Sequence, residues 1–154
     1  DKFVLKLPLA GKIIFYHQNI RFFLVFSILI KSGVTVSKAL KLAQSSFDNI
    51  YLKQKCQKIA EFCEQGLSLD EAFKKIALFE NIVLGMISVA MKSAKLDLMS
   101  EKISYYYESK SADLTQSLFS LLEPLMTLVV GILVLFLALG IFLPMWELNQ
   151  SIQF

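Results

Sequence analysis

Apolar residues in the first four fifths of the chain recur in short groups at helical spacing. Within each group the members lie three or four residues apart, so they form one stripe along a helix. The groups are Val36–Phe47, Leu52–Cys63, Leu69–Ile76, Val83–Ala94 and Ile103–Leu121. A nine-residue apolar run at Phe22–Ile30 predicts a further core helix before them. No alternating strand pattern competes, so the sequence predicts an all-α bundle of about six helices.

Residues with turn and capping preferences separate these stripes. Gly33 suits the end of the first helix, and Thr35 suits the N-cap of the second. We expect the third helix to begin near Asn49 and to close at Gly66. The segment Ser68–Glu71 has the pattern of a capping box, in which the serine bonds the glutamate amide and the glutamate reaches back.

The longest apolar run lies near the C-terminal end, at residues 124–143. It has twenty residues without a charge, and Glu123 and Glu147 bound it. A helix of that length spans about 30 Å, the thickness of the hydrocarbon core of a bilayer. The run predicts a transmembrane helix, whereas the run at Phe22–Ile30 is too short to span and lies between Arg21 and Lys31.

These elements predict four regions along the chain. Residues 1–15 form a lead-in and 16–120 a helical bundle domain, followed by a transmembrane helix at 121–146 and a tail at 147–154. The composition agrees, because apolar residues make up 55% and charged residues 19%, with a mean hydropathy of +0.56. A soluble domain has about 45–50% apolar and about 25% charged residues.

The charge distribution predicts the orientation of the chain in the membrane. All 16 Lys and Arg lie between Lys2 and Lys110, and none follows the apolar run. Under the positive-inside rule the bundle is cytoplasmic and the C-terminus periplasmic, with Trp146 at the outer interface. The net charge of +3 comes from scattered lysines and indicates no direct binding of nucleic acid.

Motifs for catalysis or cofactor binding are missing from the sequence. There is no glycine-rich phosphate loop, and His17 is the single histidine. Cys56 and Cys63 cannot supply a closed zinc site by themselves, and we interpret them as small apolar core residues. The sequence therefore predicts no catalytic residue, no cofactor and no metal, and a protein that is not an enzyme.

Glu123 has two interpretations. A carboxylate at the mouth of a membrane helix is a candidate for a functional contact. It also suits a structural hinge, because Pro124 can open a new helical segment and an acid favours the positive end of its dipole.

The run RFFLVFSILIKSGVTVSKAL at residues 21–40 resembles the opening of a known domain. This domain belongs to the inner-membrane platform proteins of type II secretion (the F protein) and of type IV pili. Further matches keep the family's order along nearly the whole chain. They are Gln65–Leu69, Met86–Ile87, Tyr105–Glu108, Glu123–Leu125 and Pro144–Leu148. The family usually has Gly-Glu-x-Ser-Gly where this chain has Ala90–Ala94, so only Ser93 matches and any role of the missing acid is not transferred.

The resemblance implies a non-enzymatic part of a machine in the bacterial inner membrane. Its partners would be a hexameric cytoplasmic ATPase, pilins or pseudopilins, other inner-membrane assembly proteins and the lipid bilayer. Family members carry two copies of the domain, and this chain resembles the second copy of a protein roughly twice its length or more. Protein secretion, pilus extension and DNA uptake remain open. The alternative is a membrane-tethered signalling or adaptor bundle.

The candidates for partner contacts are Lys92 and Lys95, Glu123, and Phe22 and Phe26. The two lysines are expected on an exposed face that receives force from the ATPase. The phenylalanines crowd one short stretch with Phe15 and Phe23, and a single helix is not expected to turn all of them inward. We expect part of this aromatic surface to pack against another copy, giving a homo-oligomer.

Overall fold

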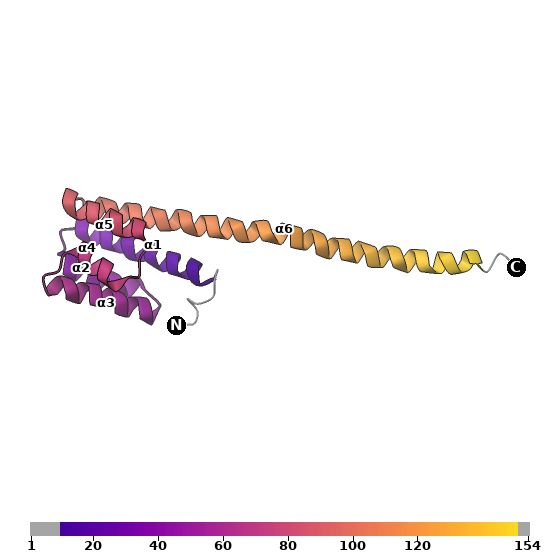
Figure 1. Ribbon diagram of the computed structural model, residues 1–154, viewed down its shortest axis with the longest axis horizontal. Coiled ribbons are helices and arrows are strands. Elements are labelled where there is room, and N and C mark those ends of the chain that lie inside the picture. The colour runs from indigo at the N-terminus through magenta and orange to yellow at the C-terminus, as the bar shows by residue number, and fades with distance from the viewer. Residues whose placement is uncertain (1–9, 151–154) are drawn as a thin grey trace. The chain divides into compact units, whose positions relative to one another are not determined.

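The computed structural model describes the backbone of residues 10–150 and the side chains of residues 11–120 and 122–140. The described backbone is helical and contains no strand (Figure 1). The elements in order are α1 (Ala10–Lys31), α2 (Val36–Ala43), the 3-10 turn η2 (Gln44–Ser46), α3 (Ile50–Glu64), α4 (Leu69–Ile76), α5 (Asn81–Ser93) and α6 (Leu96–Gln150). The predicted all-α fold class is confirmed.

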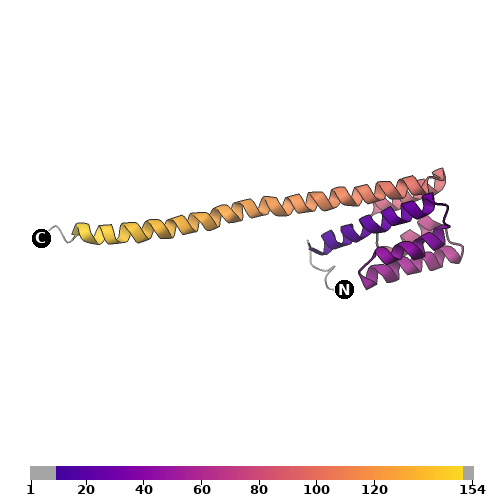
Figure 2. The same ribbon diagram turned by 180° about the vertical axis from the view of Figure 1, so that it is seen from behind.

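The chain divides into two compact units, Asp1–Leu114 and Thr115–Phe154. The first unit contains α1 to α5 and the beginning of α6, and Figure 2 shows α1 to α3 of this unit from behind. α1 begins at Ala10, within the region predicted as a lead-in over residues 1–15. The second unit is the remainder of α6, and that helix continues through Pro124. The predicted start of a new helical segment at Pro124 is therefore wrong.

Two glycines end helices as the sequence predicts. Gly33 follows α1 with φ of +81°, and Gly66 follows α3 with φ of +93°. In both turns the amide of the next residue donates to the carbonyl five residues back, with a nitrogen–oxygen distance of 3.0 Å. This bond satisfies a carbonyl that the helix leaves free, and the left-handed conformation it requires favours glycine.

The N-terminal caps differ in how their side chains bond. α3 begins next to Asn49 as predicted, and the Asn49 side chain caps it by accepting a hydrogen bond from the Tyr51 amide at 2.9 Å. Ser68 caps α4 in position, but its hydroxyl donates to Asp70 Oδ1 at 2.8 Å. The predicted capping box is wrong, because the Ser68 oxygen accepts no hydrogen bond from the helix amides and the hydroxyl instead donates to the Asp70 carboxylate. This bond is the main reason that the pKa of Asp70 lies below its ordinary value.

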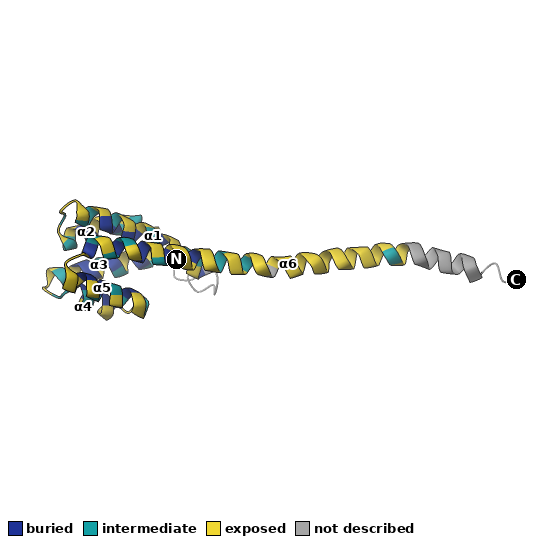
Figure 3. Cartoon of the chain, turned by 90° about the horizontal axis from the view of Figure 1, so that it is seen from above, coloured by how far each residue is buried: buried dark blue, intermediate teal, exposed yellow. Residues whose placement is uncertain are grey.

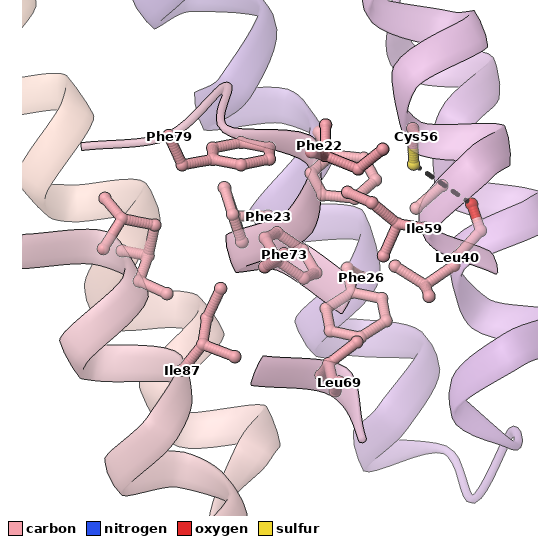
Figure 4. Close-up of a cluster of buried hydrophobic side chains, with 14 of the residues drawn as sticks. Phe22, Phe23, Phe26, Leu40, Cys56, Ile59, Leu69, Phe73, Phe79 and Ile87 are labelled. Atoms are coloured by element: carbon pink, nitrogen blue, oxygen red, sulfur yellow. Dashed lines mark hydrogen bonds between the residues drawn. The ribbon is translucent and has the colours of Figure 1, made fainter. Parts of the chain in front are cut away.

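The core of the first unit forms around the phenylalanines of α1 (Figure 4). Phe22 stacks on Phe47 with ring centroids 4.8 Å apart, while Phe23 contacts both Phe73 and Phe79. Phe47 lies beyond η2 in an extended conformation, so the helical stripe predicted to run to this residue ends early. Its ring is nevertheless buried.

Burial differs between the two units (Figure 3). In the first unit the apolar side chains that face the core are almost completely buried, whereas the large apolar side chains of residues 122–140 are exposed. Two described helical stretches are long and apolar enough to cross a membrane, Gly11–Lys31 and Leu96–Gly140. The first supplies the core phenylalanines, and the apolar window of the second has none of its residues buried.

Candidate functional site

Two of the predicted contact residues lie at the junction between α5 and α6. Lys92 is in the last turn of α5, and Lys95 lies in the short connection to α6. Both residues are exposed, and neither forms an ion pair with another described residue. The structure places both lysines on the surface beside the connection between α5 and α6. Their role as partner contacts stays a prediction.

The connection between them is held in an unusual conformation. Ala94 caps α5 in the left-handed region with φ of +53°, and the Lys95 amide donates to the Ala90 carbonyl at 3.2 Å. Ser93 binds back to the helix through its hydroxyl, which donates to the Val89 carbonyl at 2.9 Å. The direction in which Lys95 leaves the helix therefore depends on a backbone conformation that alanine adopts at a cost.

The phenylalanines proposed as an oligomer surface are buried. Phe22 and Phe23 are 0% exposed and Phe26 is 1% exposed, because helices or loops pack against α1 on several sides. Phe15 is partly buried against the same core. The prediction that Phe22 and Phe26 contact another copy is wrong. The expectation of a homo-oligomer depended on these residues and is left without support from them.

Glu123 is an exposed residue of α6 in the second unit. Its carbonyl accepts a hydrogen bond from the Thr127 hydroxyl at 3.0 Å, and its carboxylate forms no ion pair with any described residue. Because α6 continues through Pro124, Glu123 does not lie at the start of a separate helical segment. Its roles as a hinge and as a partner contact both stay predictions.

The sequence did not reveal a carboxylate that joins three elements of the first unit. Glu80 is half-buried at the N-cap of α5. Its Oε1 accepts a hydrogen bond from the Tyr16 hydroxyl of α1 at 3.2 Å, and its Oε2 accepts one from the Tyr106 hydroxyl of α6 at 2.6 Å. Burial, followed by the hydrogen bond to Glu80, raises the pKa of Tyr106 to about 12. Burial and the Glu80 charge also raise the pKa of Tyr16.

Aromatic rings and Glu80 line an open cleft of about 340 Å³. Phe15 and Tyr16 come from α1, Tyr51 comes from the first turn of α3, and Lys12 lies at the start of α1. No sequence motif connects the residues that line the cleft, which lie up to 69 positions apart along the chain.

 The pair with this separation is Gly11 and Glu80, which both line the cleft. Only the packing of the helices brings them together.

The surroundings of His17 and of the two cysteines are typical of residues with a structural role. His17 Nε2 lies 3.3 Å from the Ser111 hydroxyl, and both cysteines are free thiols. Cys56 is buried and Cys63 is half-buried, as expected for core residues, and burial raises the pKa of both thiols. Within the described part of the chain, no group of three or more His, Cys, Asp or Glu side chains is placed to hold a metal ion.

Comparison with known proteins relates the sequence of this chain to one family. Residues 22–144 match the family described as "Type II secretion system (T2SS), protein F". The chain is 28% identical over 152 residues to the type IV pilus assembly protein PilC of Pseudomonas aeruginosa, covering 99% of this chain and 41% of that protein. It is 30% identical over 150 residues to the type II secretion system protein F of the same organism, covering 97% of this chain and 37% of that protein.

A relative from a different organism gives the same result. The type IV pilus assembly protein PilC of Thermus thermophilus is 26% identical over 154 residues, which cover 99% of this chain and 38% of that protein. The chain therefore spans about two fifths of the length of these curated relatives. Because the family match covers most of the chain, including α2 to α5, the resemblance seen in the sequence is confirmed. The chain belongs to the type II secretion system protein F family.

Proposed function

We propose that this chain is part of an inner-membrane platform in a type II secretion or type IV pilus-like machine. The observation that carries the proposal is the family match over residues 22–144, together with relatives named for pilus assembly and for type II secretion. The helical bundle serves as a docking body for machine components, and it is not proposed to carry out a reaction itself.

The apolar part of the second unit is proposed to span the bilayer. The large apolar side chains of residues 122–140 are exposed, and Phe136 is 72% exposed. In water such a surface is unfavourable by about 25 cal/mol for each Å² of apolar area, whereas lipid chains solvate it. An uncharged run of twenty residues between Glu123 and Glu147 has the length that a bilayer requires.

The bundle is proposed to contact the hexameric cytoplasmic ATPase of such a machine through Lys92 and Lys95. Both lysines are exposed beside the α5–α6 connection, and neither is neutralised by a described acid. Force applied there acts at the beginning of α6, the helix that includes the proposed membrane segment. Glu123 remains a second candidate contact, for pilins, pseudopilins or other membrane components.

Charge reversal in the native gene tests the platform and its coupling. Lys92→Glu with Lys95→Glu is expected to abolish filament assembly or secretion while the protein stays in the membrane at normal abundance. Single exposed charges contribute only about 0–1 kcal/mol to stability, so the fold is expected to survive. The matched control is Lys53→Glu with Lys58→Glu, two exposed lysines of α3.

Two outcomes would contradict parts of the proposal. Normal assembly in the Lys92→Glu, Lys95→Glu strain removes these residues as the motor contact. A deletion strain that assembles filaments and secretes protein normally removes the platform function itself.

A further inference from the structure

The cleft beside Glu80 combines a carboxylate with aromatic walls. The rings of Phe15, Tyr16 and Tyr51 line it, and Glu80 lies among them. Its volume of about 340 Å³ is near the lower end of the range for ligand sites, about 300–1,000 Å³. The cleft is therefore large enough for one side chain or a small molecule and too small for a folded segment.

The walls of the cleft are held in place by the core behind them. The Tyr16 ring packs against the Tyr107 ring with centroids 5.5 Å apart, and the Phe15 ring meets Tyr107 edge to face at 6.0 Å. Tyr107 is 0% exposed. Hydrogen bonds from Tyr16 and Tyr106 fix the carboxylate of Glu80. The site is thus built before any ligand arrives, which lowers the entropic cost of binding.

The charge of Glu80 has no cationic partner within the described chain. No described lysine, arginine or histidine forms an ion pair with it, although Lys12 lies at the edge of the same cleft. A carboxylate offers about four acceptor positions on its two oxygens, so the two tyrosine hydroxyls leave room for further donors. A half-buried carboxylate that faces aromatic rings attracts an organic cation through both its charge and the ring faces.

We propose that this cleft binds the arginine or lysine side chain of a partner protein. A metal ion fits poorly, because hard cations prefer several oxygen ligands and the cleft supplies one carboxylate. A single charged anchor in a small cleft gives weak affinity by itself. That is appropriate for one anchoring side chain in a larger protein–protein interface, where such residues occupy pockets. The inference goes beyond the proposed platform function and does not depend on Lys92 or Lys95.

The test uses the whole chain in detergent micelles with ¹³C-labelled tyrosines and capped arginine as the probe. N-acetyl-arginine amide is expected to shift the resonances of Tyr16 and Tyr51 in a saturable manner, with a Kd on the order of millimolar. Tyr105, which is 60% exposed and does not line the cleft, serves as the internal control and is expected to stay unchanged. N-acetyl-citrulline amide, the uncharged isostere of the probe, is expected to bind at least about tenfold more weakly, since it lacks the charge-assisted bond.

Two variants separate the effect of charge from damage to the fold. Glu80→Gln is expected to weaken the binding of capped arginine to the level seen for capped citrulline. Lys12→Met changes an exposed residue and is expected to tighten the binding of capped arginine about twofold, because it removes a like charge near the cation.

Several results would overturn the inference. Equal shifts from capped arginine and capped citrulline would show that charge is not recognised. The absence of saturable shifts in the wild-type chain, or a Lys12→Met variant that binds capped arginine less well, would likewise reject the site. None of these results bears on the assembly phenotype that tests the platform function.

Discussion

Two alanines at helix ends hold a backbone conformation that favours glycine. Ala77 ends α4 with φ of +48°, and Ala94 ends α5 with φ of +53°. For an L-residue with a Cβ atom the left-handed region costs about 1–2 kcal/mol, whereas glycine enters it readily. Ala94 occupies the position at which the resemblance to the family leads one to expect glycine.

Replacing Ala94 by glycine is therefore expected to stabilise the first unit. The gain should be about 0.5–1 kcal/mol, because relief of the strained φ exceeds the extra chain entropy that glycine brings to the unfolded state. Urea unfolding in detergent, followed by circular dichroism, measures it. Ala112→Gly, at an exposed position within α6, is the matched control and should destabilise by about 1 kcal/mol. A lower midpoint for Ala94→Gly would contradict the strain argument.

The contribution of the hydrogen bond from Tyr106 to Glu80 to folding stability is expected to decrease at high pH. Its folded-state pKa of about 12 lies above the ordinary value of 10.0, so the unfolded chain loses this proton first as the pH rises. The hydrogen bond therefore contributes its full stabilisation below about pH 10, and this contribution is lost as the pH approaches about 12.

Tyr106→Phe isolates that contribution. The wild-type chain should be more stable than the variant at about pH 9, and the difference should shrink towards about pH 11.5. Urea midpoints over this range give the measurement, with Tyr105→Phe as a control for loss of a hydroxyl from an exposed ring. A difference that grows with pH would show that the sign is wrong.

At the scale of the element, α1 is a core helix whose neighbours cover more than one side. Adjacent residues on a helix point about 100° apart, so a helix with one neighbour buries only one of them. Phe22 nevertheless meets Phe47 beyond η2, and Phe23 meets Phe73 of α4 and Phe79 beyond it. Serine hydroxyls also join α1 to α6, since Ser104 donates to the Ile20 carbonyl at 3.1 Å.

Truncation of Phe23 tests the role of α1 as a core element. Phe23→Ala is expected to destabilise the first unit by about 3–5 kcal/mol, because it removes a completely buried ring and leaves a cavity. Leu24→Ala, on the same helix but 45% exposed, should change stability by much less and serves as the control. Thermal unfolding gives both values. An unchanged midpoint accompanied by loss of an oligomer would restore the interface interpretation that the burial contradicts.

At the scale of the whole molecule, the asymmetry of basic residues predicts the membrane orientation. Lys102 and Lys110 precede the apolar run closely, and no Lys or Arg follows it. The bundle is therefore expected in the cytoplasm and Phe154 in the periplasm.

Reporter fusions after Phe154 measure this orientation. A reporter that is active only outside the cytoplasm should be active there, and a cytoplasmic reporter at the same position should be inactive. The opposite pattern would reverse the proposed topology, and equal activity of the two would indicate that the chain has no fixed orientation. A matched pair of fusions after Lys110 should give the reverse result.

The local features of the fold could be predicted from the sequence by itself. The stripe from Leu69 to Ile76 coincides with α4, and Gly33 and Gly66 end the helices that they were expected to end. Each of these depends on neighbours within a few residues, through periodicity, capping and the conformational freedom of glycine. The all-α class and the long apolar segment follow from the same short-range patterns.

The tertiary structure decided the features that depend on several elements at once. Burial of both Phe22 and Phe23 requires neighbours on different sides of α1, and periodicity along one helix cannot show how many neighbours it has. Glu80 meets Tyr16 and Tyr106, which lie 64 and 26 residues away in sequence, so no local motif could reveal the cleft. Packing alone sets such contacts, because side chains distant in sequence become neighbours only when the helices assemble.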